Sequence, residues 1–133
     1  MQIVIFKLND EQFAVETSKV QGINEMMEVT LVPRAPEHIK GLINLRGNII
    51  SLLDINLLLK KEKANAPQTN IIILNMQEEL VGISVDGVDE VLNIEEGIIE
   101  KIEDDSKSVY VKGVLNLQDR IVTFIDVDKL ILN

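Results

Sequence analysis

The sequence predicts an all-β protein made of two copies of one small barrel. The first observation is an apolar hairpin pattern at residues 40–54, which returns 72 residues later at residues 112–126. The second is that the earlier strands repeat as well, since residues 3–6 align with residues 71–74. The third is that each copy contains about five short strands, enough for a small barrel that closes its own edges.

The hairpin of the first copy shows the pattern most clearly. Residues 40–45 and 49–53 are mostly Leu and Ile, which is typical of strands with little solvent exposure. A turn of two or three residues is predicted between them at Arg46, Gly47 and Asn48, because Gly and Asn tolerate the positive φ that tight hairpins need.

An aspartate ends each hairpin and is predicted to cap a short helix. Asp54 precedes residues 55–58, and Asp126 precedes the last apolar segment of the chain. A carboxylate at this position accepts hydrogen bonds from the free backbone N–H groups of the first helical turn.

The remaining elements of the first copy follow in order. Residues 3–8 and 12–15 are predicted to be antiparallel strands. A short helical segment is predicted at residues 19–23, where Thr and Ser precede it as possible caps. Residues 26–32 alternate between apolar and polar and are predicted to be extended, before two prolines at residues 33–36 impose a bend.

The second copy is predicted in the same way. Its strands are residues 70–76 and 80–85, followed by residues 86–91, which match the short helical segment of the first copy. Residues 95–107 are acidic and loop-like, and residues 110–125 form the second hairpin.

A polar segment with one proline divides the two copies. It spans residues 60–69, so that the expected subdomains are approximately residues 1–60 and 69–133, with exchange of strands between them left open. A chain of 133 residues is enough for one ordinary domain or two very small ones. We therefore expect the two copies to pack on one another within a single domain of residues 1–133.

Composition excludes several classes of function. The net charge of −9 argues against nucleic acid or an anionic membrane as the main partner, because both require clustered Lys and Arg. The absence of Cys excludes disulfides, thiolate metal sites and thiol nucleophiles. The longest apolar run, residues 49–59, is too short to span a bilayer, so no direct membrane insertion is expected.

An enzyme is the main rival class, and the residues do not favour it. His38 is the only histidine, and no Ser or Cys motif accompanies it. Adjacent acidic residues such as Glu78 and Glu79 point to opposite faces of a strand and make poor catalytic pairs. Residues 86–90 superficially suggest a calcium loop but lack its ligand spacing. We therefore expect no catalytic residues, no metal and no cofactor.

The repeat also serves as an internal control for function. Residues that the copies share are expected to be structural, because both copies need them to fold. Residues that differ in chemistry between the copies are candidates for a function such as binding. At the hairpin tip, the first copy has Arg46 and Gly47 where the second has Gln118 and Asp119. A guanidinium on such a tip is a good bidentate donor for a carboxylate. The alternative is an ordinary solvated turn arginine.

Two stretches of the chain resemble a known family. Residues 32–50, VPRAPEHIKGLINLRGNII, resemble the signature of the CheW family, and residues 85–92, VDGVDEVL, resemble its second recurring stretch. The similarity covers essentially the whole chain. It implies two SH3-like five-stranded β-barrels around a shared hydrophobic core, with short capping helices.

The resemblance also implies a function and its partners. CheW proteins are cytoplasmic, non-catalytic adaptors that couple chemoreceptors (methyl-accepting chemotaxis proteins) to the histidine kinase CheA in bacterial chemotaxis. Such a protein would be a monomer in isolation and would be recruited to membrane-associated receptor arrays. The alternative is a CheW-like domain excised from a larger protein, either the CheA regulatory domain or a receiver-fused coupling protein; the stand-alone adaptor is the simplest expectation.

The resemblance assigns two sets of binding residues. Those expected to contact the kinase regulatory domain are Arg46, Gly47, Asn44 and Ile23. Those expected to contact the tip of the receptor's cytoplasmic hairpin, in a groove between the barrels, are Val20, Ile23, Gly82 and Val91.

One position departs from the family pattern. Family members often carry a glutamate beside the tip arginine, where this chain has Gly22. Glu25, Glu28 and Glu37 are the candidates to replace that carboxylate as a partner of Arg46.

Overall fold

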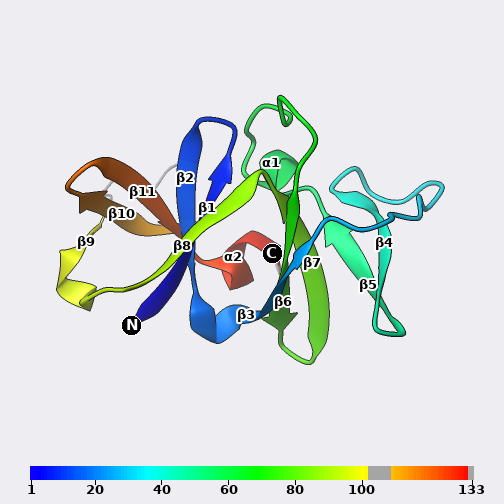
Figure 1. The fold of residues 1–133 in the computed structure, drawn as a ribbon, viewed down its shortest axis with the longest axis horizontal. Helices are drawn as coiled ribbons and strands as arrows, with labels where there is room; N and C mark the ends of the chain where they lie inside the picture. The colour runs from blue at the N-terminus through cyan, green and yellow to red at the C-terminus, as the bar shows by residue number, and fades with distance from the viewer. Residues whose placement is uncertain (102–108, 132–133) are drawn as a thin grey trace.

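Two β-sheets lie side by side and account for most of the chain (Figure 1). The computed structural model describes residues 1–101 and 109–131. Sheet A has the strand order β8-β1-β2-β11-β10-β9, with bounds β1 (Gln2–Leu8), β2 (Glu11–Glu16), β8 (Gly87–Asn93), β9 (Ile99–Glu100), β10 (Val111–Leu117) and β11 (Arg120–Ile125). Sheet B has the order β3-β6-β7-β5-β4, with bounds β3 (Val20–Glu25), β4 (Ile39–Leu45), β5 (Asn48–Leu53), β6 (Asn70–Met76) and β7 (Glu79–Val85).

The two sheets confirm the predicted all-β class, and each takes strands from both copies of the repeat. In sheet A, β1 and β2 from the first copy join β8 to β11 from the second, and β2 pairs in parallel with β11. In sheet B, β3 to β5 join β6 and β7, and β5 pairs in parallel with β7. Each sheet therefore draws on residues on both sides of the linker, and neither corresponds to residues 1–60 or 69–133 alone.

Three clusters of buried side chains form the interior. Alternation along each strand divides them: on β1, Val4 and Phe6 face a large shared cluster, whereas Ile3 and Ile5 face the core of sheet A. The shared cluster also contains residues of sheet B, such as Ile72 and Ile83. The core of sheet B is separate and consists of Ile43, Ile50, Leu52, Ile71 and Ile73.

Two short α-helices carry the caps that the sequence predicts. In α1 (Ile55–Leu58), the Asp54 carboxylate accepts a hydrogen bond from the Leu57 N–H at 3.1 Å. In α2 (Val127–Ile131), the Asp126 carboxylate accepts from the N–H groups of Asp128 at 3.1 Å and Lys129 at 3.3 Å. Figure 1 shows α2 between the two sheets, where Val127 and Leu130 join the shared core.

The helical segments predicted at residues 19–23 and 86–91 are wrong. Only Thr17–Lys19 is helical there, as one 3-10 turn, whereas residues 20–23 belong to β3 and residues 87–91 belong to β8. Each strand contains a β-bulge, between Val20 and Gly22 in β3 and between Val88 and Glu90 in β8. A bulge inserts one extra residue, so side chains on one face lie three positions apart instead of two. Residues three positions apart also share a face of an α-helix, so the two patterns look alike in the sequence.

The other long segments are less regular than predicted. Residues 26–32 have no strand of their own, and only Thr30 forms a β-bridge, with Leu42 of β4. Residues 95–101 contain a 3-10 turn, Glu96–Ile98, and the two-residue strand β9, which pairs with β10; residues 102–107 of the predicted acidic loop lie outside the described residues. Thr30 and β9 occupy equivalent places, because Thr30 lies against β4 and β9 lies against β10, the matching first strands of the two repeated hairpins.

Two glycines shared by the copies are explained by this close approach. A Cβ on Gly41 would lie 2.4 Å from the Thr30 carbonyl oxygen, and a Cβ on Gly113 would lie 2.6 Å from that of Glu100. The glycine of the repeated Lys-Gly pair therefore belongs to the fold, as the internal comparison of the copies predicts.

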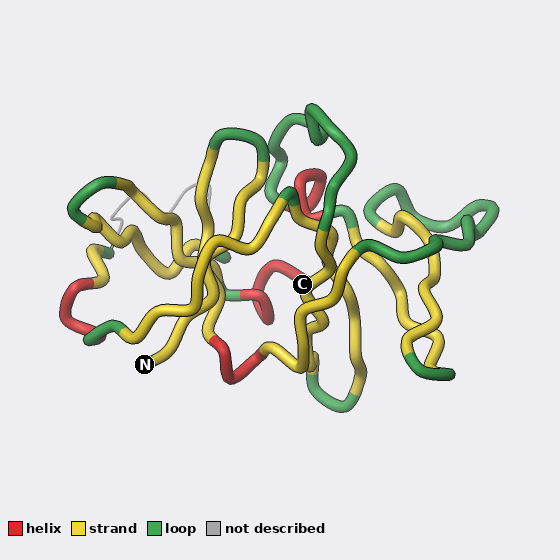
Figure 2. Tube along the Cα trace, viewed as in Figure 1, coloured by secondary structure: helices red, strands yellow, loops and turns green. Residues whose placement is uncertain are grey.

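A buried polar cluster holds the linker against sheet B. The Gln68 side chain accepts hydrogen bonds from Lys40 Nζ and Ser84 Oγ, both at 2.6 Å, and donates to Asn56 Oδ1 at 3.3 Å. Gln68 and Asn56 are buried. The linker that contains Gln68 is a long loop between α1 and β6 (Figure 2). Each amide therefore finds a partner inside the protein, which is what a buried polar group requires.

Candidate interaction site

The β4–β5 turn forms a tight, exposed hairpin tip. Arg46 has φ 53° and Gly47 has φ 88°, so these two residues make the turn, and Asn48 already belongs to β5. The turn is therefore the shorter of the two lengths predicted, two residues and not three. The Asn44 side chain accepts a hydrogen bond from the Gly47 N–H at 2.8 Å, which ties the strand to the turn. The residues assigned to kinase binding at this tip, Arg46, Gly47 and Asn44, are all exposed.

Arg46 forms no ion pair with any residue that the structure describes. The three glutamates considered as replacements for the family's usual carboxylate, Glu25, Glu28 and Glu37, therefore do not pair with it. Gly22, on the bulged part of β3, has no side chain to offer. The guanidinium is thus available to a carboxylate from another molecule.

An apolar depression adjoins this tip. It has a volume of about 580 Å³ and lies between residues 27–30 and the β4–β5 hairpin; its lining residues are Met27, Glu28, Thr30, Leu42, Ile43, Asn44 and Ile49. Ile49 is 63% exposed, and Leu31, which follows the lining residue Thr30, is 78% exposed. Sequence reasoning missed Ile49, although strict alternation along β5 with buried Ile50 and Leu52 would have placed it on the outer face.

Ile23 and Val91, two of the residues assigned to receptor binding, occupy equivalent exposed positions on the two edge strands. Ile23 on β3 pairs with Ile72, and Val91 on β8 pairs with Val4. Both partners belong to the shared core, so both side chains lie on the face toward the junction of the sheets. Their exposed fractions are 41% and 49%.

The other two predicted receptor residues are less accessible. Val20 is partly buried against the shared core, as is its counterpart Val88. Gly82 is buried inside sheet B, where a Cβ would meet Ile71 at 3.0 Å and Leu52 at 3.4 Å. The structure therefore places Gly82 in the core of sheet B and not on a surface that a partner could touch.

The backbone at His38 takes part in a contact that the repeat conserves. The His38 carbonyl accepts a hydrogen bond from the Asp54 N–H at 2.7 Å, and Tyr110 does the same for Asp126 at 2.6 Å. The second copy therefore keeps this backbone hydrogen bond although Tyr110 stands where the first copy has His38. Among residues 1–101 and 109–131, no acidic and histidine side chains gather in a way that could hold a metal ion.

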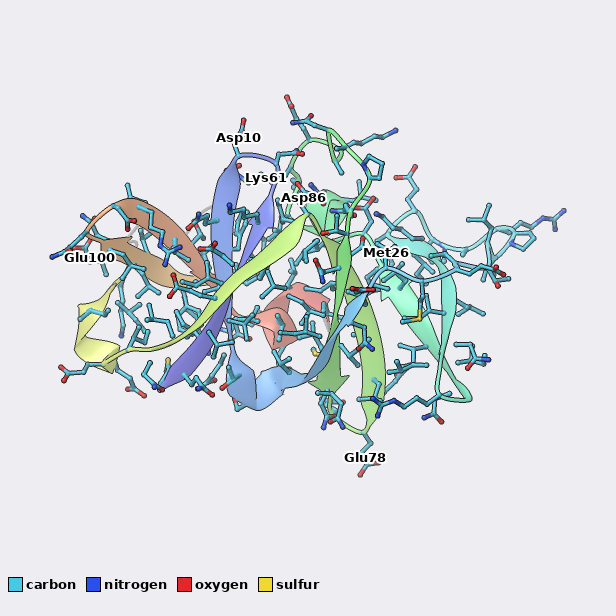
Figure 3. The ribbon with its side chains drawn as sticks, in the orientation of Figure 1. Asp10, Met26, Lys61, Glu78, Asp86 and Glu100 are labelled. Carbon is cyan, nitrogen blue, oxygen red and sulfur yellow. The ribbon has the colours of Figure 1, made fainter. Side chains whose placement is uncertain are left out.

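The segment that superficially suggested a calcium loop is part of the sheets. Asp86 lies where the chain passes from β7 to β8 (Figure 3), and its carboxylate accepts a hydrogen bond from the Asn9 N–H. Asp89 and Glu90 on β8 both pair with Arg120 on β11, an ion cluster that sequence reasoning did not find. No helix in the part of the chain that the structure describes is long and apolar enough to cross a membrane.

Comparisons with known proteins agree with this architecture. Residues 2–133 match the family model of the CheW-like domain. The chain is 31% identical to "Chemotaxis protein CheW" of Klebsiella aerogenes, covering 98% of this chain and 81% of that protein. It is 26% identical to the protein of the same name from Thermotoga maritima, covering 98% and 87%.

A solved structure gives the same result for the fold. The crystal structure of scaffolding protein TtCheW from Thermoanaerobacter tengcongensis superposes with a TM-score of 0.87 at 30% identity, covering 97% of this chain and 86% of that chain. Sequence, sheet topology and these comparisons lead to one conclusion: the chain belongs to the CheW-like domain family.

Proposed function

We propose that this protein is a non-catalytic adaptor of bacterial chemotaxis, which couples chemoreceptors to the histidine kinase CheA. The observation that carries the proposal is Arg46 on a tight hairpin tip, with no ion-pair partner among the described residues, in a chain that matches the CheW-like domain over residues 2–133. The relatives described above are named CheW proteins, which favours the adaptor over a CheA regulatory domain or a receiver-fused protein. The adaptor acts in the cytoplasm and is recruited to receptor arrays at the membrane.

In this proposal the two partners use different surfaces. The kinase regulatory domain binds the hairpin tip, where it supplies a carboxylate to Arg46 and covers the adjoining depression. The receptor hairpin binds at the junction of the sheets, along the exposed side chains of Ile23 and Val91. Calorimetric titration of the wild-type chain with a purified CheA regulatory domain and with a receptor cytoplasmic fragment tests both; absence of binding to either partner would contradict the adaptor role.

Replacing Arg46 with Gln should weaken kinase binding without affecting the fold. Gln77 adopts a φ of 52° at the β6–β7 turn, close to that of Arg46, so the new side chain fits this backbone. We expect stability within about 0.5 kcal/mol of wild type, as for most surface changes. Loss of a hydrogen-bonded ion pair should weaken binding of the regulatory domain by about 1.5–3 kcal/mol. Arg46→Lys should also be impaired, since one ammonium cannot reproduce the planar fork.

Arg34 provides the matched control for this experiment. It is also an exposed arginine with positive φ, at 65°, but it lies in the proline-containing bend and not at the tip. Arg34→Gln should bind the regulatory domain as the wild type does. Equal affinities for the wild type and Arg46→Gln would remove Arg46 from the kinase site.

Replacing Val91 with Asp should weaken receptor binding selectively. Since Val91 is 49% exposed, the carboxylate remains hydrated in the free protein and the melting temperature should change little. Burying that charge in the complex is costly, so we expect receptor affinity to fall at least about tenfold. Ile98, which is 42% exposed on the 3-10 turn beyond β8, is the control: Ile98→Asp should leave receptor binding unchanged. A collapsed melting temperature in Val91→Asp would identify a core valine instead.

A further inference from the structure

Arg120 lies over one end of the sheet A core. It is the first residue of β11, and Val122 and Phe124, two and four positions later, are buried in that core. Because side chains alternate along a strand, Arg120 points to the same inner face. Its side chain is only 19% exposed. A guanidinium in this position must find partners within the protein.

Its partners come from β8, which is not a neighbour of β11 in the sheet. Nη1 donates to Asp89 Oδ2 and Nη2 donates to Glu90 Oε2, while Nη1 also lies 3.5 Å from Gln12 Oε1 on β2. Hydrogen bonds to Glu90 and Asp89 raise the pKa of Arg120. The arginine therefore joins the first and fourth strands of the sheet order β8-β1-β2-β11 with a permanent charge.

The bulge in β8 makes this double contact possible. Ile5 pairs with Glu90 and Phe6 pairs with Val88, so Asp89 is the extra residue with no partner across the ladder. In a regular strand, adjacent side chains point to opposite faces, but a bulge re-aims one of them. Asp89 and Glu90 can thus approach one guanidinium together, and the next residue, Val91, returns to the face of the shared core.

Sheet B has the same bulge without the ion cluster. Gln21 is the extra residue there, and Gly22 and Asn48 occupy the places of Glu90 and Arg120, which lie 68 and 72 residues later. Within the described residues, no ion pair involves Gln21, Gly22 or Asn48. The cluster is therefore a feature of the β8 edge and not a requirement of the bulge.

We infer that Arg120 is a positioning residue: it holds the Asp89–Glu90 bulge and thereby presents Val91 to an apolar helical hairpin bound at the junction. The inference rests on the proposed receptor-binding function, because Val91 is the residue through which it acts. Arg120 itself faces the interior of sheet A and does not need to touch the partner. Removing Arg120 would leave the adjacent carboxylates of Asp89 and Glu90 without a counter-charge. The bulge in β8 would then lose the contact that holds it in place.

Arg120→Gln tests the inference through two readouts. Amide hydrogen exchange in β8 should accelerate at least about tenfold, since local opening follows from lost contacts, while exchange in β3 stays as in the wild type. Affinity for a receptor cytoplasmic fragment should fall about three- to tenfold, which lies within the range by which residues that do not touch a ligand alter its binding. Affinity for the kinase regulatory domain, assigned to the Arg46 tip, should not change.

Two further variants separate positioning from general damage. Asp119 is the control, because its carboxylate is 85% exposed and lies 3.8 Å from Arg120 Nε; Asp119→Asn should behave as the wild type in both readouts. The exchange of charges in Arg120→Glu with Glu90→Arg should restore part of the slow exchange and of the receptor binding, because it rebuilds the Arg120–Glu90 pair in reverse while Asp89 loses its guanidinium partner on β11. If Arg120→Gln does not fold, Arg120→Lys retains one contact and takes its place.

The possible failures can be told apart. Unchanged exchange in β8 would overturn the role of Arg120, and so would faster exchange with unchanged receptor affinity. Equal weakening of receptor and kinase binding would show general damage and also overturn it. A wild-type chain that binds no receptor fragment would instead contradict the proposed function, independently of the exchange data.

Discussion

Phe6→Ala is expected to lower the free energy of unfolding of the whole chain by about 3–5 kcal/mol, the range for removing a buried Phe. Phe6 is fully buried in the shared core and stacks on Phe13 with a centroid distance of 6.0 Å. The same core contains Ile72 and Ile83 of sheet B, so the cavity affects both sheets. Denaturant unfolding followed by circular dichroism and differential scanning calorimetry should show one transition at a lower midpoint.

A matched pair of variants tests whether the sheets unfold together. Ile5 lies in the core of sheet A and Ile73 in the core of sheet B, at equivalent positions of the repeat, and both are almost fully buried. Replacing either with Ala should lower the free energy of unfolding by about 2–5 kcal/mol, and both variants should still unfold in one transition. If the two changes shifted different transitions, the sheets would be independent folding units and the shared core would not couple them.

Gly41→Ala is expected to destabilise the protein by about 3–5 kcal/mol, from overpacking and from lost hydrogen bonds. The added Cβ would lie 2.4 Å from the Thr30 carbonyl oxygen and 2.7 Å from Val29 Cγ1. A backbone oxygen cannot turn away as a flexible side chain would. Relief requires Thr30 to move away from Leu42, which breaks two backbone hydrogen bonds of 2.8 Å. The measurement is the free energy of unfolding in denaturant.

Two other glycines complete this experiment. Gly113→Ala should have an effect of similar size in sheet A, because its Cβ would lie 2.6 Å from the Glu100 carbonyl oxygen. Gly97→Ala is the control, since no atom lies within 4 Å of its added Cβ, and it should change stability by less than about 0.5 kcal/mol. A Gly41→Ala protein as stable as the Gly97→Ala protein would show that the close approach does not exist in solution.

Local chemistry in the sequence was sufficient to predict the strands of both hairpins, both helix caps and the repeat. Alternation of apolar residues and the turn residues around Gly47 act over a few positions, so they can be recognised without knowing what a strand packs against. The caps at Asp54 and Asp126 depend only on the next three residues. The same local pattern also explains why Arg46 could be singled out, since it differs between two otherwise similar tips.

Only the tertiary structure decided which strands belong together and what faces outward. The sequence predicts helical segments at residues 19–23, from possible Thr and Ser caps, and at residues 86–91, from the match between the copies, but residues 20–23 and 87–91 lie in bulged edge strands. A bulge is recognised from the register with the neighbouring strand, and that neighbour lies about 50 to 90 residues away in the sequence, as for Gly22 with Ile73 and Ile5 with Glu90.

The burial of Gly82 and the contact of Arg120 with β8 depend on the same long-range pairing. Gly82 is enclosed because β7 lies between β6 and β5, and Arg120 on β11 contacts Asp89 on β8 across the two strands, β1 and β2, that separate them in the sheet order. Side-chain alternation specifies which residues share a face of one strand, but it carries no information about which strand will cover that face. In this protein the covering strand is decided by pairing between strands on opposite sides of the 60–69 linker, β2 with β11 and β5 with β7.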